Sequence, residues 1–143
     1  MIVSTRGRYA LRVMIDIAEH PNEPYIPLKS IAARQGISEK YLEAIVASLV
    51  KSGNLCALRG KKGGYRLVKE PGEYNMTDIL EVTEGTFAPV ACMETGKNEC
   101  ERYGQCKTIK MWEGLNRVLC DYFENITLED LLNEGLDGDN YII

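Results

Sequence analysis

The sequence predicts a mainly α-helical fold with a small β-hairpin, arranged as a winged helix-turn-helix followed by one long helix. Three observations lead to this fold class. Apolar residues repeat at helical spacing along most of the chain, two helical stretches are separated by a short glycine-containing turn, and residues 54–69 change to the period of short strands. With 143 residues, 45% of them hydrophobic, the chain has the size of one domain and can bury a core.

The first helix is predicted over residues 5–20. Ser4 and Thr5 are candidate caps at its start, and Pro21 stops it. Its apolar residues share one face, as expected for a helix that packs on a core, and they are Ala10, Val13, Met14 and Ile17. His20, the single histidine, falls at the end of this helix, where a cation is simply favourable.

Two further helices follow in close succession and form the helix-turn-helix candidate. The segment LKSIAARQ is predicted to be a short helix that Gly36 ends. The next helix begins with Ser38 as its N-cap, ends at Gly53 and carries a continuous apolar stripe of Leu42, Ile45, Val46 and Leu49. In a helix-turn-helix, the second helix of the pair is the recognition helix that enters the major groove of DNA.

A β-hairpin with a basic turn is predicted directly after the helix pair. The stretch RGKKGGYRL, from Arg59 to Leu67, holds four cations and three glycines, although the whole chain has a formal net charge of -4. Residues 1–70 carry 12 Lys and Arg against 6 Asp and Glu, whereas residues 71–143 carry 5 against 15. This asymmetry indicates that the first half of the chain meets a polyanion.

The hairpin occupies the position of the wing in a winged helix-turn-helix, which reaches along the DNA backbone or the minor groove. Its cations are candidates for phosphate contacts, and its glycines permit positive φ angles and close approach of the backbone to phosphates. The candidates are Arg59, Lys61, Lys62 and Arg66, with Gly60, Gly63 and Gly64. If the basic turn is considered by itself, the alternative to a DNA-binding wing is a hairpin tip that is merely soluble. The helix pair that precedes the hairpin favours the wing.

Candidate DNA contacts also lie in the first turns of the predicted recognition helix. Lys40 and Tyr41 lie outside its apolar stripe, which makes them the better candidates. Ser38 is either a helix cap alone or a phosphate ligand as well. Glu43 either accepts a hydrogen bond from a cytosine amino group or remains a solvated bystander.

The second half of the chain contains four further features. A short helix is predicted near residues 75–84. Residues 86–107 show neither helical nor strand periodicity in their apolar residues, and they hold three of the five cysteines. From about residue 108 to 123, apolar residues wrap more than one face of a helix, which a second copy of the chain would cover. Another short helix is capped by Thr127. The predicted units are a DNA-binding domain (1–83), a cysteine loop (84–107), the dimerisation and last helices (108–133) and an acidic tail (134–143).

Several protein classes are disfavoured. No run of 18 apolar residues and no basic leader is present, so we expect no membrane association and a cytoplasmic location. With one histidine and no nucleophile–base pair, we do not expect an enzyme. In the cytoplasm, five cysteines indicate thiols or metal ligands rather than structural disulfides.

Four segments resemble a known family, in order and at its spacing: STRGRYALRVMIDIA, LKSIAARQGISEKYLEAIVASLVKSG, LRGKKGGYRL and ITLEDLL. Over residues 1–133, the chain resembles the bacterial winged-helix regulators IscR, NsrR and CymR. The resemblance implies a homodimeric transcription factor, usually a repressor, of iron-sulfur cluster biogenesis or cysteine and sulfur metabolism. It places DNA contacts at Ser38, Lys40, Tyr41, Glu43 and Arg59, with the wing at Lys61, Lys62, Gly63 and Gly64.

The same resemblance implies a metal centre in the cysteine loop. Family members that sense iron-sulfur status hold a two-iron, two-sulfur (2Fe-2S) cluster by three loop cysteines, which match Cys92, Cys100 and Cys106. The fourth ligand is a histidine in IscR-like proteins and a carboxylate in the first helix of NsrR-like proteins. These two positions are Ile109 and Arg8 here, so neither fourth ligand is present.

Other interpretations of the cysteines remain open. The fourth ligand of a cluster could be Glu94, Glu101, Cys120, the backbone or solvent. The three loop cysteines could instead bind zinc, act as redox-responsive thiols or have no function. Cys56 in a wing strand is expected to serve packing, and Cys120 on the apolar face of the long helix is expected to be buried.

The end of the chain raises a separate possibility. The segment GDNYII ends in Tyr141, Ile142 and Ile143, and resembles the end of CymR-type regulators and the tails that serine acetyltransferases insert into cysteine synthase. A free carboxylate beside a branched apolar side chain suits a pocket built for an amino acid. The alternatives are therefore a tail that binds cysteine synthase and a disordered end.

Overall fold

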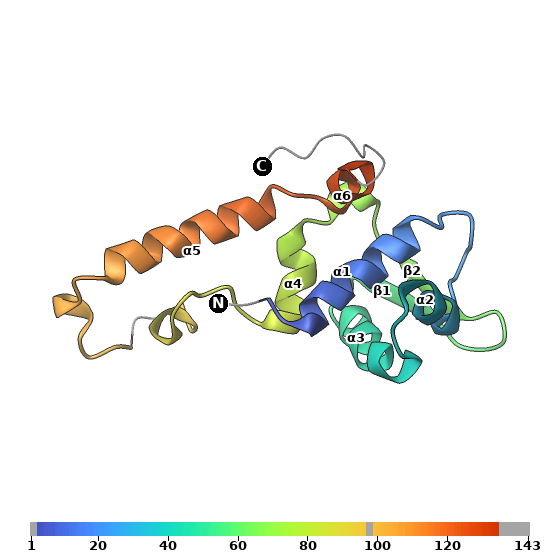
Figure 1. The fold of residues 1–143 in the computed structure, drawn as a ribbon, viewed down its shortest axis with the longest axis horizontal. Helices are drawn as coiled ribbons and strands as arrows, with labels where there is room; N and C mark the ends of the chain where they lie inside the picture. Colours follow the sequence, from blue (N-terminus) through green and yellow to red (C-terminus); the bar gives the residue numbers. More distant parts are fainter. Residues whose placement is uncertain (1–2, 97–98, 135–143) are drawn as a thin grey trace.

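The computed structural model describes residues 3–96 and 99–134. It has the predicted mainly α-helical fold with one two-stranded hairpin, and Figure 1 shows one long helix, α5, extending away from the remainder. Short 3-10 helices lie at Pro71–Glu73, Ala91–Met93 and Tyr103–Gln105. The main elements are α1 (Thr5–Ala18), α2 (Leu28–Gln35), α3 (Glu39–Lys51), β1 (Leu55–Leu58), β2 (Gly64–Leu67), α4 (Met76–Glu84), α5 (Ile109–Glu124) and α6 (Leu128–Glu134).

Side-chain caps start α1 and α3 as the sequence predicts. The Ser4 hydroxyl accepts from the Gly7 amide at 3.1 Å, and the Ser38 hydroxyl accepts from the Tyr41 amide at 3.1 Å. The first helix ends at Ala18, two residues earlier than predicted. The C-terminal boundary was thus less predictable than the capped start.

The helix-turn-helix is formed by α2, α3 and the turn between them. Gly36 has φ 64 and ψ 35, the left-handed conformation that glycine adopts without steric cost, and it ends α2. Immediately afterwards, Ser38 caps α3, so the two helices pack across a turn of three residues. Buried apolar side chains from α1, α2, α3 and α4 form the core, and they include Val13, Met14, Ile31, Leu42, Ile45, Leu49 and Ile79.

The wing is the antiparallel pair of β1 and β2, with Leu55 opposite Leu67 and Leu58 opposite Gly64. Ile26, in the loop after α1, adds a bridge to Tyr65 through two backbone hydrogen bonds of 2.9 Å. A side chain at Gly64 would collide with the backbone of Ile26, so glycine is needed there. Gly63 does not have the positive φ that the sequence suggested; glycine is needed because a Cβ would collide with the Leu58 carbonyl.

Tyr74 holds the base of the wing. Its ring is fully buried, and its hydroxyl donates to the Asn54 carbonyl at 2.8 Å. The same oxygen accepts from the amides of Val68 and Lys69 at 2.9 and 3.0 Å. One phenol thus joins the residue before β1 to the two residues after β2.

The segment after α4 runs outward from the core, and α5 leads back to α6, which packs on the core through Leu128 (Figure 1). Two backbone hydrogen bonds join the start of α6 to the segment before α4. The Leu128 amide donates to the Tyr74 carbonyl at 2.9 Å, and the Met76 amide donates to the Ile126 carbonyl at 3.0 Å. Of the residues of α5, Ile109 alone is buried. Among the described residues, no helix has the length and apolar character needed to span a membrane.

Candidate nucleic-acid interface

The face of α3 opposite the core is exposed and accessible to a ligand. Its exposed residues are Glu39, Lys40, Tyr41, Glu43, Ala44, Ala47 and Lys51. Helical spacing places Lys40, Ala44, Ala47 and Lys51 along the centre of this face. Leu42, Ile45, Val46 and Leu49 on the opposite side are buried, as predicted. An α-helix with one small-residue, cationic face free of the core fits the major groove of B-form DNA.

The predicted contacts on α3 lie around this exposed face. The Ser38 hydroxyl is engaged as the cap of the helix. The Lys40 side chain is exposed near the centre of the face, and the Glu43 side chain is exposed at its edge. Tyr41 is 44% exposed, although it lies on the side of α3 nearest α1. These placements agree with the predicted positions of the side chains but do not test their roles.

Tyr41 is held by residues of α1 that sequence analysis missed. Its ring meets the edge of the Tyr9 ring, with centroids 5.6 Å apart and planes at 85°. The guanidinium of Arg12 lies over Tyr9 at 5.3 Å from the centroid, and its Nε donates to the Gln35 side chain at 3.0 Å. The position of Tyr41 therefore depends on both α1 and α2. Nothing in the local sequence pattern signals this contact.

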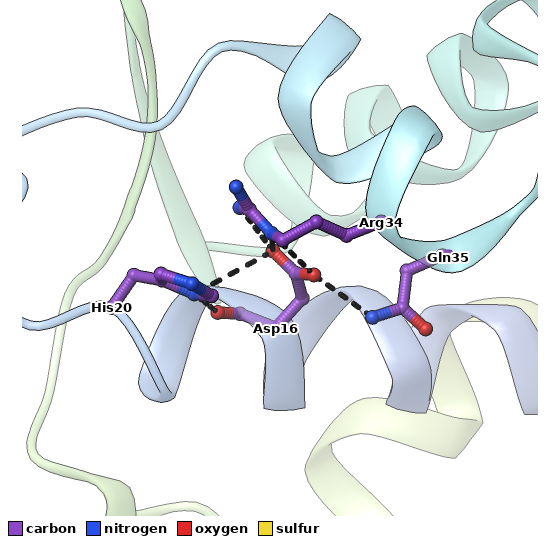
Figure 2. Close-up of polar contacts among 4 residues, drawn as sticks. All are labelled: Asp16, His20, Arg34 and Gln35. Atoms are coloured by element: carbon purple, nitrogen blue, oxygen red, sulfur yellow. Dashed lines mark hydrogen bonds and ion pairs between the residues drawn. The ribbon is translucent and has the colours of Figure 1, made fainter.

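Behind the helix-turn-helix lies a buried carboxylate, also missed from sequence. Asp16 of α1 is 1% exposed, and Figure 2 shows it between His20 and the pair Arg34 and Gln35 of α2. Arg34 donates to both carboxylate oxygens, and Gln35 Nε2 donates to Oδ2 at 2.8 Å. His20 Nδ1 lies 2.7 Å from the Asp16 carbonyl oxygen. A signal did exist in the sequence, because Asp16 interrupts the otherwise apolar run VMIDIA.

The tip of the wing presents three exposed cations, Arg59, Lys61 and Lys62. A turn closed by a 3.0 Å hydrogen bond from the Gly63 amide to the Gly60 carbonyl carries the two lysines at its centre. Arg66 is placed differently, because its guanidinium lies over the Tyr25 ring at 5.1 Å. The wing therefore offers a compact set of donors at its tip, which suits phosphate oxygens.

The cysteine loop does not bring its three thiols together as a metal site. Cys100 is exposed and Cys92 and Cys106 are half-buried; no cluster of three or more Cys, His, Asp or Glu side chains in the described ranges is placed to hold a metal. A hydrogen bond with the Thr108 hydroxyl lowers the pKa of Cys106, whereas burial raises the pKa of Cys120.

The structure also places the two positions at which family members carry a fourth ligand. Ile109 is buried and apolar, and Arg8 is exposed with its guanidinium on the Thr5 hydroxyl at 3.0 Å. Three thiolates on one loop are the donor chemistry of an iron-sulfur cluster. Their arrangement here is not that of an assembled site.

Four large apolar side chains on α5 are exposed and share one face. Met111, Leu115, Val118 and Tyr122 are 56%, 41%, 64% and 62% exposed, at intervals of four, three and four residues. We call this set the α5 stripe. The tail residues Tyr141, Ile142 and Ile143 lie outside the described residues.

Comparison with known proteins supports the resemblance. A family model described as Rrf2, iron-dependent transcriptional regulator, matches residues 3–134. The transcriptional regulator IscR of Pectobacterium atrosepticum is 35% identical over 133 residues, which cover 93% of this chain and 80% of that protein. IscR of Vibrio vulnificus is 33% identical over 135 residues, which cover 94% and 79%.

Two solved structures show the same similarity in three dimensions. CymR, described as the global cysteine regulator of B. subtilis, has a TM-score of 0.76 and 34% identity, and the match covers 94% of this chain and 98% of that one. IscR of T. potens has a TM-score of 0.74 and 36% identity, with 94% and 88% covered. The relatives are named as regulators of transcription, not as enzymes.

Proposed function

The chain belongs to the Rrf2 family of iron-dependent transcriptional regulators, and from this premise we propose that it binds operator DNA as a homodimer and represses transcription. The observation that carries the proposal is the exposed cationic tip of a wing that directly follows a helix-turn-helix. In this arrangement, α3 enters the major groove and supplies Lys40, Tyr41 and Glu43, while Arg59, Lys61 and Lys62 contact the backbone or the minor groove.

The α5 stripe supports the dimer. Exposed large apolar side chains in one continuous row are uncommon on a monomer's surface and indicate a partner. A second copy presents the same row, so α5 can pair with α5 about a twofold axis. Such a dimer would place two recognition helices on half-sites about one helical turn, roughly 34–36 Å, apart.

Regulation is proposed to act through the cysteine loop, which leads directly into α5. Cys92, Cys100 and Cys106 would hold a 2Fe-2S cluster, for which thiolates are suitable ligands. Glu94 or Glu101 of the same loop, Cys120, the backbone or solvent would complete the ligand set. Because the loop ends at the start of α5, a change in its ligand state would shift the population of dimers whose recognition helices match the operator.

A thiol switch is the second candidate, and one observation favours it: in the described ranges the loop thiols do not form a group placed to hold a metal. The lowered pKa of Cys106 increases its thiolate fraction, and thiolates are the species that oxidants and soft metals attack. Under this alternative, zinc binding or oxidation in the cysteine loop replaces the cluster. Both candidates use the same loop and predict the same DNA interface.

Cysteine metabolism is a further proposal, supported by similarity to a structure described as the global cysteine regulator. It would engage the tail that ends in Tyr141, Ile142 and Ile143 with cysteine synthase. Deletion of Ile143 should abolish binding to purified cysteine synthase while leaving DNA binding intact. Unchanged binding would exclude this partner.

The central experiment measures the salt dependence of DNA binding by the wing. Replacing Arg59, Lys61 and Lys62 with alanine should lower the affinity for a selected operator and reduce the slope of log K against log salt by about 0.9 for each phosphate that is no longer neutralised. Lys110, exposed on α5 and outside the proposed interface, offers the control Lys110→Ala. A triple variant with the wild-type slope would contradict the wing assignment.

A further inference from the structure

Arg6 precedes the helix-turn-helix in sequence by more than twenty residues, yet it lies beside the recognition helix. Its Nη2 donates to the hydroxyl of Ser48 on α3 at 2.9 Å, and Ser48 donates to the Ala44 carbonyl at 3.0 Å. Arg6 is nevertheless exposed. Since a guanidinium has five N–H donors, the bond to Ser48 orients the side chain and leaves other donors free.

The backbone that carries Arg6 is anchored on both sides. Ser4 caps α1, and its hydroxyl also donates to the carboxylate of Glu84 on α4 at 2.5 Å. One turn later, Tyr9 packs against Tyr41 of α3. The first turn of α1 is therefore held against α4 and α3, and Arg6 starts from a fixed position rather than from a loose terminus.

A hollow of about 470 Å³ lies between the start of α1 and the exposed face of α3. Its lining is Arg6, Ser38, Lys40, Tyr41, Ala44 and Ile45. Two cations from two different helices stand at this hollow together with a hydroxyl and a phenol. Apolar atoms of Ala44 and Ile45 complete the lining. The hollow as a whole therefore suits a ligand that has an anionic group attached to an apolar part.

We propose that this hollow binds one sugar–phosphate unit of the operator backbone, with Arg6 as a phosphate ligand contributed from outside the helix-turn-helix and the wing. This inference rests on the proposed function, because it requires α3 to enter a major groove. A helix in that groove is bordered by the two sugar–phosphate strands, so a cation on its flank faces phosphate. The deoxyribose lies over the apolar lining while Arg6 and Lys40 neutralise the charge.

The chain offers a matched control in Arg8. It is an exposed arginine of the same helical turn, but its guanidinium is bound to Thr5 of its own helix and it does not line the hollow. Arg6→Gln and Arg8→Gln thus remove the same charge from α1 at two positions two residues apart. Arg6→Lys keeps the charge but loses the planar fork that binds Ser48.

The test uses the full-length protein and a duplex operator selected with the wild type from a random library. Arg6→Gln should reduce the slope of log K against log salt by about 0.9 for each half-site bound. When salt is raised from 50 to 200 mM, the wild type should therefore lose more affinity than Arg6→Gln, by a factor of about 3.5 for each half-site. Arg8→Gln should keep the wild-type slope, and Arg6→Lys should restore most of it. Circular dichroism establishes that each variant is folded.

A second measurement locates the phosphate. Neutral methylphosphonates are placed at each operator position in turn. At one position the substitution should weaken the wild type more than it weakens Arg6→Gln, in which Lys40 is the remaining cation at that phosphate. A wild-type slope and interference pattern in Arg6→Gln would overturn the inference while leaving the DNA-binding function standing. A slope reduced equally in Arg6→Lys would also overturn it, since the bond to Ser48 would then be the cause. Absence of salt-dependent DNA binding by the wild type would overturn both proposals.

Discussion

Arg34 joins the helix-turn-helix to the first helix through Asp16, whose Oδ1 lies 2.6 Å from the arginine Nη2. The Asp16 side chain is 1% exposed, whereas that of Arg34 is 33% exposed. The hydrogen bond to Asp16 raises the pKa of Arg34 above its ordinary value, so the guanidinium is charged throughout the range in which the protein is studied. The pair thus consists of a buried carboxylate and a partly exposed guanidinium that reaches it from the protein surface.

Replacing Arg34 with methionine should destabilise the protein, because it leaves a buried carboxylate with Gln35 as its remaining side-chain donor. Removal of one partner of a buried pair costs about 3–5 kcal/mol, and the partial exposure of Arg34 places the expected cost near the lower limit, at about 3 kcal/mol. Urea unfolding measures it. Arg8→Met, at an exposed arginine of α1, should change stability by less than about 0.5 kcal/mol. An Arg34→Met variant as stable as this control would show that water replaces the guanidinium.

Tyr74→Phe should loosen the wing. It removes the oxygen that serves the Asn54 carbonyl and the amides of Val68 and Lys69, and unpaired buried polar groups cost about 1–3 kcal/mol. We expect the free energy of unfolding in urea to fall by about 2 kcal/mol and hydrogen exchange at the two amides to become faster. Tyr103→Phe is the control, because that exposed hydroxyl reaches Glu113 at 3.3 Å. Unchanged exchange at both amides would argue against Tyr74 as the anchor.

Val118→Glu should convert the proposed dimer into monomers. Val118 is 64% exposed in the middle of the α5 stripe, and a carboxylate there would face its own copy across a twofold axis. Analytical ultracentrifugation at micromolar concentration measures the effect. The neighbouring Arg117 is exposed on the polar side of α5, so Arg117→Glu should leave the oligomer intact. If Val118→Glu stays dimeric, the two copies associate through another surface.

Anaerobic reconstitution with iron and sulfide tests the cluster. The wild type should acquire charge-transfer absorption and bind acid-labile sulfide, and alanine at Cys92, Cys100 and Cys106 should abolish both. Alanine at Cys56, a half-buried thiol of the wing, is the control and should leave the absorption unchanged. A colourless wild type that binds zinc or forms a disulfide would favour the thiol switch instead.

Asp130 provides a pH-dependent contribution to stability. Its carboxylate accepts from the Thr127 amide at 2.8 Å, and this bond, with the threonine hydroxyl, lowers the pKa of Asp130. A folded-state pKa below the unfolded value stabilises the protein above the ordinary carboxyl pKa, and the effect is lost as the pH falls through the depressed value.

The difference in free energy of unfolding between the wild type and Asp130→Asn should therefore be present at neutral pH and shrink in acid. A difference that stays constant from neutral pH to strong acid would mean that the Thr127–Asp130 cap does not depend on charge.

Local sequence determined which segments are helices, where capped helices begin and where the hairpin turns. Ser38 and Gly36 act within a few residues of themselves, so their preferences predict the same geometry in most contexts. The apolar stripe of α3 predicted which side of the recognition helix is buried, because helical spacing relates sequence to face directly. The cationic character of the wing likewise followed directly from the residues of the stretch RGKKGGYRL.

Tertiary structure alone decided which distant groups meet. The partners of Asp16 lie 18 and 19 residues away, the hydroxyl of Tyr74 serves both sides of the wing, and Arg6 reaches Ser48 across 42 residues. Periodicity states which face a residue occupies but not which side chain opposes it, because that depends on how helices pack in three dimensions. The cysteine spacing likewise predicted a donor set, whereas the placement of the thiols depends on how the loop folds between α4 and α5.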